Sequence, residues 1–91
     1  MSKVKILLEI DCPPTLRLQE PLSRSIFEDI LHRKWRVPDH TFFGNWDWEI
    51  TVTEEQHEKI KKFLTRAFEQ NLVRYAGWGE IEEKEEDDIS H

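Results

Sequence analysis

Cys12 and Arg17 are the first residues whose types and spacing could support catalysis. The cysteine follows a strand-like segment and precedes a helical one, as in the loops with which cysteine phosphatases hold a phosphate through backbone N–H groups and an arginine. Those loops place five residues between cysteine and arginine. This chain places four there, and two of them are prolines, which have no N–H group. We therefore interpret Cys12 as an ordinary loop cysteine.

The histidines at positions 32, 40, 57 and 91 offer no local metal site, because none lies one helical turn from another histidine or from the cysteine. A single cysteine also excludes an intrachain disulfide and a multi-cysteine zinc site. The sequence has no nucleophile–base pair and no P-loop. We predict a protein that is not an enzyme, without catalytic residues, metal or cofactor, and we expect His57 to be a solvated surface residue.

The acidic residues are concentrated at the C-terminal end of the chain. The sequence carries 19 acidic and 13 basic side chains, for a net charge of −6. Residues 80–88 hold seven acids and one lysine, which leaves twelve acids and twelve bases in residues 1–79. A neutral body does not attract a phosphate backbone, so we expect no direct nucleic-acid binding. The sequence predicts a folded domain over 1–79 and an acidic tail over 80–91.

The acidic tail is the first candidate contact surface. Residues 82–91 show no apolar period and are predicted to be disordered. Such a tail either keeps a protein dissolved or imitates a phosphate backbone and docks on a basic partner surface. In the second interpretation the partner-binding residues are Glu80, Glu82, Glu83, Glu85, Glu86, Asp87 and Asp88.

Two segments with strict alternation of apolar and polar residues predict half-buried strands. They are residues 3–10 (KVKILLEI) and residues 46–52 (WDWEITV). Thr53 and Gln56 then form the pattern of a capping box, which predicts that a helix over 54–71 follows directly. Its apolar stripe consists of Ile60, Phe63, Leu64, Ala67 and Phe68.

Weaker patterns predict the remaining elements. Residues 21–35 have a helical apolar stripe, with Pro21 at the first helical position. A short strand is expected over 40–43, and a last strand over 72–78. One sheet with two helices on one face would bury every apolar stripe. The fold class is α+β, and the favoured arrangement is a ferredoxin-like βαββαβ two-layer sandwich, or a three-stranded variant if residues 40–43 form only a loop.

The core of this sandwich should contain Trp46 and Trp48, with Trp48 packed on Phe63. The face of the strand opposite the tryptophans carries Asp47 and Glu49, whose carboxylates would repel RNA. That open face is the second candidate contact surface for a protein partner, with Trp78 as its aromatic anchor. The expected members of the face are Lys5, Glu9, Asp47, Glu49, Arg74 and Trp78.

The order of these elements resembles the layout of the DinI family, small acidic proteins that modulate the RecA recombinase. The likeness covers about residues 3–70 and includes the helix that opens TEEQHEKIKKF. The chain departs from the family in the mixed charge of that helix, which carries Lys59, Lys61, Lys62 and Arg66, and in the strand-like segment that follows. The resemblance therefore implies a small protein that acts on nucleic-acid machinery, as inhibitors from phages and mobile elements do, rather than direct modulation of RecA.

The sequence favours a non-catalytic regulatory or inhibitory protein that binds a larger protein partner, one that handles nucleic acid. The alternative is a structural subunit or assembly factor that docks through its open sheet face, and a small-ligand sensor or an enzyme comes third. With no signal segment and no apolar run of about 18 residues, we expect a cytoplasmic protein without membrane contact. The oligomeric state and the partner's identity do not follow from the sequence.

Overall fold

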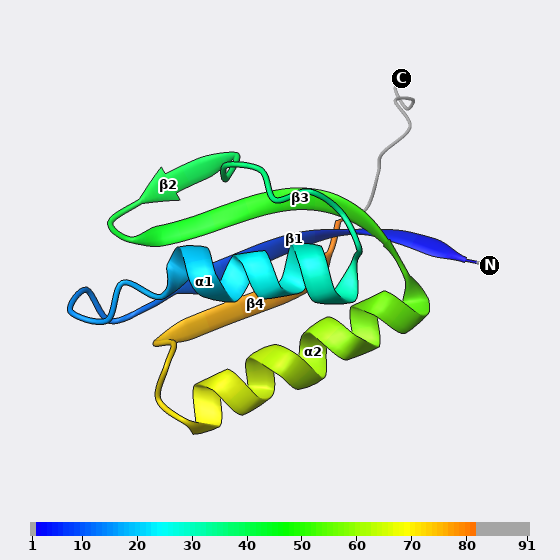
Figure 1. The fold of residues 1–91 in the computed structure, drawn as a ribbon. Helices are drawn as coiled ribbons and strands as arrows, with labels where there is room; N and C mark the ends of the chain where they lie inside the picture. Colours follow the sequence, from blue (N-terminus) through cyan, green and yellow to red (C-terminus); the bar gives the residue numbers. More distant parts are fainter. Residues whose placement is uncertain (1, 82–91) are drawn as a thin grey trace, which may run out of the picture.

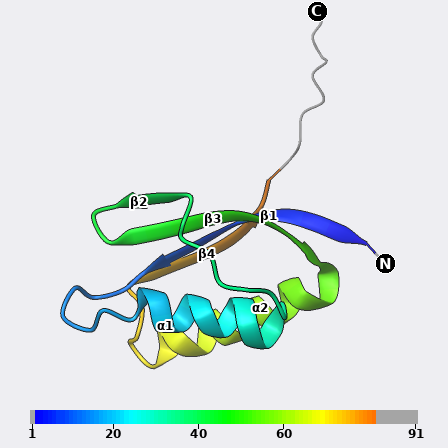
Figure 2. The same cartoon turned by 45° about the horizontal axis from the view of Figure 1, so that its top comes forward.

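The structure is a computed structural model that describes residues 2–81. It has an α+β fold in which a four-stranded antiparallel sheet, in the order β2-β3-β1-β4, carries both helices on one face (Figures 1 and 2). The segment at 40–42 is a strand, so the three-stranded variant is excluded. The elements are β1 (Lys3–Asp11), α1 (Gln19–Arg24), a π-helical continuation (Ser25–Ile30), β2 (His40–Phe42), β3 (Asn45–Thr53), α2 (Glu54–Glu69) and β4 (Tyr75–Glu80).

The two alternating strands form the centre of the sheet, as their sequences predict. β1 and β3 pair antiparallel, and the register places Leu8 opposite Trp48 and Ile6 opposite Ile50. Their apolar faces are buried under the helices because every second side chain points to the same side. The predicted capping box at Thr53 is present: Gln56 N donates to Thr53 Oγ1 and Thr53 N donates to Gln56 Oε1, both at 3.0 Å.

The first helix differs from the prediction of 21–35. It begins at Gln19, widens into π-helical turns and ends after Ile30, and His32 takes a left-handed φ of 56°. Trp35 therefore lies outside the helix, where its indole N–H donates to the hydroxyl of the buried Ser23 at 2.8 Å. This turn directs residues 33–39 back towards β3, so a segment predicted as helix becomes a connector that follows the edge of the sheet.

The last strand also differs from its predicted bounds of 72–78. Asn71 has a left-handed φ of 63°, and Leu72 N donates to Ala67 O at 2.9 Å, which ends α2 before the predicted residue 71. β4 begins at Tyr75 and continues to Glu80, the residue with which the predicted tail begins. Phe68, predicted within the buried stripe of α2, is 56% exposed.

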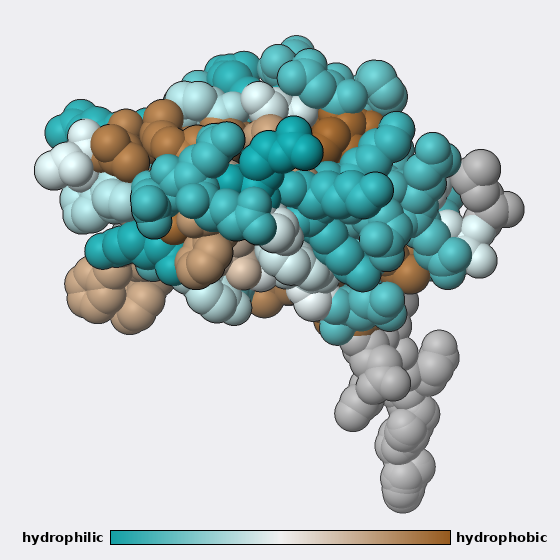
Figure 3. Space-filling view, turned by 90° about the horizontal axis from the view of Figure 1, so that it is seen from below, coloured by the Kyte–Doolittle hydropathy of each residue, from teal (hydrophilic) through white to brown (hydrophobic). Residues whose placement is uncertain are grey.

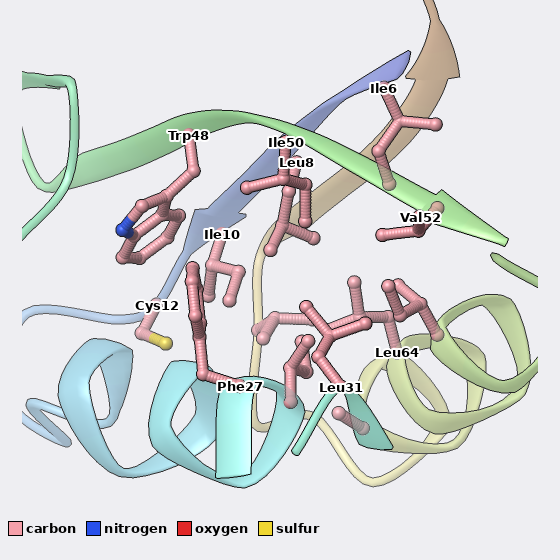
Figure 4. Close-up of a cluster of buried hydrophobic side chains, with 14 residues drawn as sticks. Ile6, Leu8, Ile10, Cys12, Phe27, Leu31, Trp48, Ile50, Val52 and Leu64 are labelled. Carbon is pink, nitrogen blue, oxygen red and sulfur yellow. The ribbon is translucent and has the colours of Figure 1, made fainter. Parts of the chain in front are cut away.

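Trp48 is the largest fully buried side chain of the core. Its ring lies 5.8 Å from that of Phe27, centroid to centroid, and 6.2 Å from that of Trp46, so Phe27 takes the place predicted for Phe63 (Figure 4). The indole N–H donates to Arg36 O at 3.0 Å, which satisfies the one polar group that the ring buries. Trp46 is only partly buried and packs against the core from its margin.

Replacing Trp48 should test this core directly. We expect Trp48→Ala to lower the free energy of unfolding by about 3–5 kcal/mol, because it empties the volume between β3 and the first helix. Trp46→Ala, on the same strand but partly exposed, should cost clearly less. Chemical denaturation followed by circular dichroism measures both values, and equal losses for the two variants would contradict the packing.

The turn between β2 and β3 carries an unusual residue. Phe42 pairs with Asn45, so the loop has two residues, Phe43 and Gly44, with φ of 51° and 86°. Positive φ at both positions is typical of a type I′ turn, which favours asparagine at the first position, whereas a bulky residue is strained there. Phe43 is 87% exposed and buries little in return.

We expect Phe43→Asn to raise the free energy of unfolding by about 1 kcal/mol, because it relieves left-handed strain at little loss of buried area. Phe42→Asn, at the neighbouring strand position, is the matched control and should not stabilise. A melting curve for each variant decides the point, and a Phe43→Asn protein that melts below the wild type would show that the Phe43 ring stabilises the turn.

Candidate functional site

The open face of the sheet is covered by charged side chains that pair with one another. Lys5 Nζ lies 4.0 Å from Glu49 Oε1, and Arg74 Nη2 donates to Asp11 Oδ1 at 2.6 Å. Of the predicted members, Lys5 and Glu49 are brought together in one ion pair, whereas Arg74 lies apart from them in a pair with Asp11 at the other end of β1. A face whose charges are paired in this way offers a partner little unbalanced charge.

Two further carboxylates of the open face are also occupied. His40 Nδ1 lies 3.0 Å from Asp47 Oδ1, and this contact raises the pKa of His40. Glu9 accepts a hydrogen bond from the phenol of Tyr75, which raises the pKa of Tyr75. Asp47 and Glu9 lie where the sequence places them, and Asp47 is held against a histidine rather than presented to solvent, with its side chain 16% exposed.

Trp78 does not lie on the open face, so this part of the prediction is wrong. The register places it opposite Leu8, whose side chain is buried beneath the sheet, and it packs against the core from the helix side. Arg74 N donates to Asp11 O at 2.6 Å while Asp11 pairs with Tyr75, so two successive residues oppose one. Arg74 precedes β4, so the alternation that begins at Tyr75 does not extend to it: the Arg74 side chain reaches Asp11 on the open face, whereas that of Trp78 lies on the helix side.

Trp78 instead lines an apolar groove between β4 and α2. The groove has a volume of about 230 Å³, and its lining residues are Leu64, Thr65, Phe68, Tyr75, Ala76 and Trp78. Sites for drug-sized ligands usually exceed about 300 Å³, so the groove suits a single side chain better. Figure 3 shows such apolar side chains scattered among predominantly hydrophilic ones on the side seen from below.

His57 contacts the same strand and is not the solvated residue that was predicted. It is 7% exposed, and its Nε2 lies 2.8 Å from Trp78 O. The ring thus ties the first turn of α2 to β4. The sequence could not indicate this, because the flanking glutamates at 54, 55 and 58 give His57 the surroundings of a surface position.

A basic ridge on α2 lies next to the apolar groove and shares Thr65 with it. The hollow along this ridge has a volume of about 270 Å³ and is lined by Lys61, Lys62, Thr65, Arg66 and Glu69. Lys61 pairs with Glu58 at 3.1 Å, an interaction that lowers the pKa of Glu58. Lys62 and Arg66 form no ion pair with any residue in 2–81, so they are the charges that this surface offers to a partner.

The outer edge of β3 is closed by side chains of the connector 33–39. Glu49 N donates to Asp39 Oδ2 at 2.7 Å, and Arg36 Nη2 donates to Glu49 O at 2.9 Å. Arg33 Nη2 donates to Thr51 O at 2.5 Å. These groups satisfy main-chain positions that the three-residue β2 is too short to reach, and they block this edge against another strand.

We expect this closure to depend on pH through Asp39. Its hydrogen bond from Arg36 and then that from Glu49 N–H hold its pKa below the ordinary value of 3.8. A lowered folded-state pKa contributes stability that is present above the unfolded value and lost as the pH falls through the folded one. Asp39→Asn should therefore destabilise the protein at neutral pH, and this deficit should shrink at a pH well below the ordinary pKa of 3.8. Urea denaturation at both pH values measures this, and a deficit independent of pH would contradict it.

Of the residues considered for catalysis, Cys12 lies in the buried core. Cys12 is 1% exposed, and burial raises the pKa of its thiol, which disfavours the nucleophilic thiolate. Within residues 2–81 no three His, Cys, Asp or Glu side chains are grouped so as to hold a metal ion. None of the helices in the same range is long and apolar enough to cross a membrane.

The predicted tail residues are placed only at their start. Glu80 is the last residue of β4 and lies opposite Ile6 in the register. The acids at 82, 83 and 85–88 lie outside the described residues. In comparisons with known proteins, no protein-family model, no curated protein and no solved structure matches the chain.

Proposed function

We propose that this protein is a non-catalytic regulator or inhibitor that binds a larger protein partner through its acidic C-terminal run. The observation that carries the proposal is the segregation of charge. Residues 1–79 carry twelve acids and twelve bases, some of which form ion pairs on the open face, while residues 80–88 carry seven acids and one lysine. An excess of charge of one sign is what attracts a partner over distance, and the excess negative charge of this sequence lies in this run.

The partner that this charge fits is a protein with a basic, nucleic-acid-binding channel. Seven carboxylates in nine residues have a charge spacing within a factor of about two of a single nucleic-acid strand. A run of this kind would compete with nucleic acid for such a channel. The resemblance to the DinI family supports the same class of partner, since its members act on a recombinase.

We also propose that the domain carrying this run has the ferredoxin-like arrangement. Two features support it: the succession βαββαβ, and a sheet in which β1 lies between β3 and β4 under two helices. In this arrangement the chain after β4 leaves from an edge strand. The alternative function, docking through the open sheet face, is less favoured because Lys5, Glu49 and Asp47 already contact charged neighbours there.

The experiment is a capture from a lysate of the source cells at low salt, with the whole protein as bait. Glu85→Gln, Glu86→Gln and Asp87→Asn together remove three charges from the acidic run. Glu28→Gln, Asp29→Asn and Glu69→Gln remove three acids elsewhere and serve as the matched control. We expect the first variant to lose the specifically captured protein and the control to retain it.

The kinetics with that captured protein provide the sharper test. Removing all seven acids should slow association by about tenfold or more and flatten its dependence on salt, with a smaller effect on dissociation. Unchanged binding by the fully neutralised protein at ordinary salt would refute a role for the acidic run. Asp47→Asn with Glu49→Gln would then show whether the open face makes the contact.

A further inference from the structure

The two outer edges of the sheet differ in how their main-chain groups are protected. At β3, Asp39, Arg36 and Arg33 occupy main-chain groups that β2 leaves open. β4 is the edge strand on the other side, and among residues 2–81 it pairs with β1 alone. Proteins usually protect an exposed edge, because its unpaired N–H and C=O groups are a template for another strand.

The register shows which main-chain groups of β4 point outward. Ile81 N donates to Lys5 O at 2.8 Å, and groups in an antiparallel pair alternate in direction. Gly79 and Gly77 therefore face β1, while the N–H and C=O groups of Ala76, Trp78 and Glu80 point away from it. The hydrogen bond between His57 Nε2 and Trp78 O agrees with this direction and occupies one of the six groups.

The surface beneath this edge would also select the side chains of a strand that is added to it. An added strand would direct alternate side chains to the helix side of the sheet, where the groove formed by Leu64, Phe68 and Trp78 can take an apolar one. The basic ridge with Lys62 and Arg66 adjoins the groove. An acidic side chain two positions from the apolar one would meet this ridge.

We propose that the outer edge of β4 binds an extended segment of a protein partner as a fifth strand, with an apolar residue in the groove and an acidic residue against Lys62 and Arg66. This surface shares the main chain of Glu80 with the acidic run, but it does not depend on the charge of that run. A second copy of this chain fits less well, because pairing of β4 with β4 would bring two basic ridges together on the same side of the sheet. Backbone hydrogen bonds would supply the affinity, and the groove and ridge the specificity.

The test uses the full chain and a defined peptide, acetyl-Thr-Glu-Thr-Phe-Thr-Glu-Thr-amide. Its Phe and Glu residues share one face of a strand in either direction of binding. Amide hydrogen exchange by NMR should show protection rising by about tenfold or more at Ala76, Trp78 and Glu80 when the peptide is added. Gly77 and Gly79, which already bond to β1, should change little.

Two alternately N-methylated peptides separate strand addition from mere contact with the groove. One is methylated at the four Thr nitrogens and the other at the Phe and Glu nitrogens. An added strand presents one of these sets to β4, so one peptide should bind about tenfold more weakly and the other about as well as the parent. Equal binding by both peptides would overturn the proposal.

Variants of the protein test the edge and the ridge. Ala76→Pro removes an outward N–H without touching the bonds to β1 and should abolish binding, whereas Gly79→Ala keeps every outward N–H, places its methyl group in open space and should bind. Unchanged exchange at Gly77 and Gly79 confirms that the proline variant is folded. Lys62→Glu with Arg66→Glu should weaken binding by about three- to tenfold, while Lys59→Glu, already paired with Glu55, should have little effect. Full binding by Ala76→Pro would contradict strand addition.

Other occupants of the edge give distinguishable results. If the amides of Ala76, Trp78 and Glu80 are protected without peptide, and deletion of residues 82–91 removes this protection, the chain's own terminus occupies the edge and the proposal is overturned. Protection that rises with protein concentration would assign the edge to a second copy instead. The capture experiment with the neutralised acidic run tests the proposed function alone. Its outcome does not change what the peptide experiment says about the β4 edge.

Discussion

The structure depends on the hydrogen bond that the buried indole N–H of Trp48 makes inside the core. Its ring fills the space between β3 and the first helix, and its N–H group needs an acceptor there, which is Arg36 O at 3.0 Å. That bond fixes the connector along the outer edge of β3. The same connector then brings Asp39 and Arg33 to the main chain of β3, so the packing of one side chain leads to the closure of an edge.

Because the β3 edge is closed, a partner has to bind elsewhere on the molecule. The open face is occupied by its own ion pairs, and the β3 edge is covered by side chains. Other candidates are the edge of β4, with the groove and basic ridge of α2 beneath it, and the acidic run that begins at its last residue, Glu80. In the two proposed contacts, charge in the run would favour rapid encounter and main-chain pairing a defined geometry, so the two features would serve different steps of binding.

The sequence predicted the elements whose signals are local. The alternation of residues 46–52 and the capping box at Thr53 depend on neighbours in the chain, and both are found as predicted. Trp78 was placed on the wrong face because β4 begins only at Tyr75, after Arg74, and only the register with β1 reveals which face Trp78 takes. The end of the first helix, the burial of His57 and the closure of the β3 edge likewise depend on contacts between residues distant in sequence.

The measurement that tests this account most directly is the amide exchange rate of Glu49 in a Trp48→Phe protein. Phenylalanine keeps an aromatic ring in the core but cannot donate to Arg36 O, so the connector loses its fixed position. The account predicts that the Glu49 amide, bonded to Asp39, loses protection while amides of the β1–β3 ladder such as Ile50 keep theirs. Glu49 protection equal to that of the wild type would contradict the claim that the indole bond holds the edge closed.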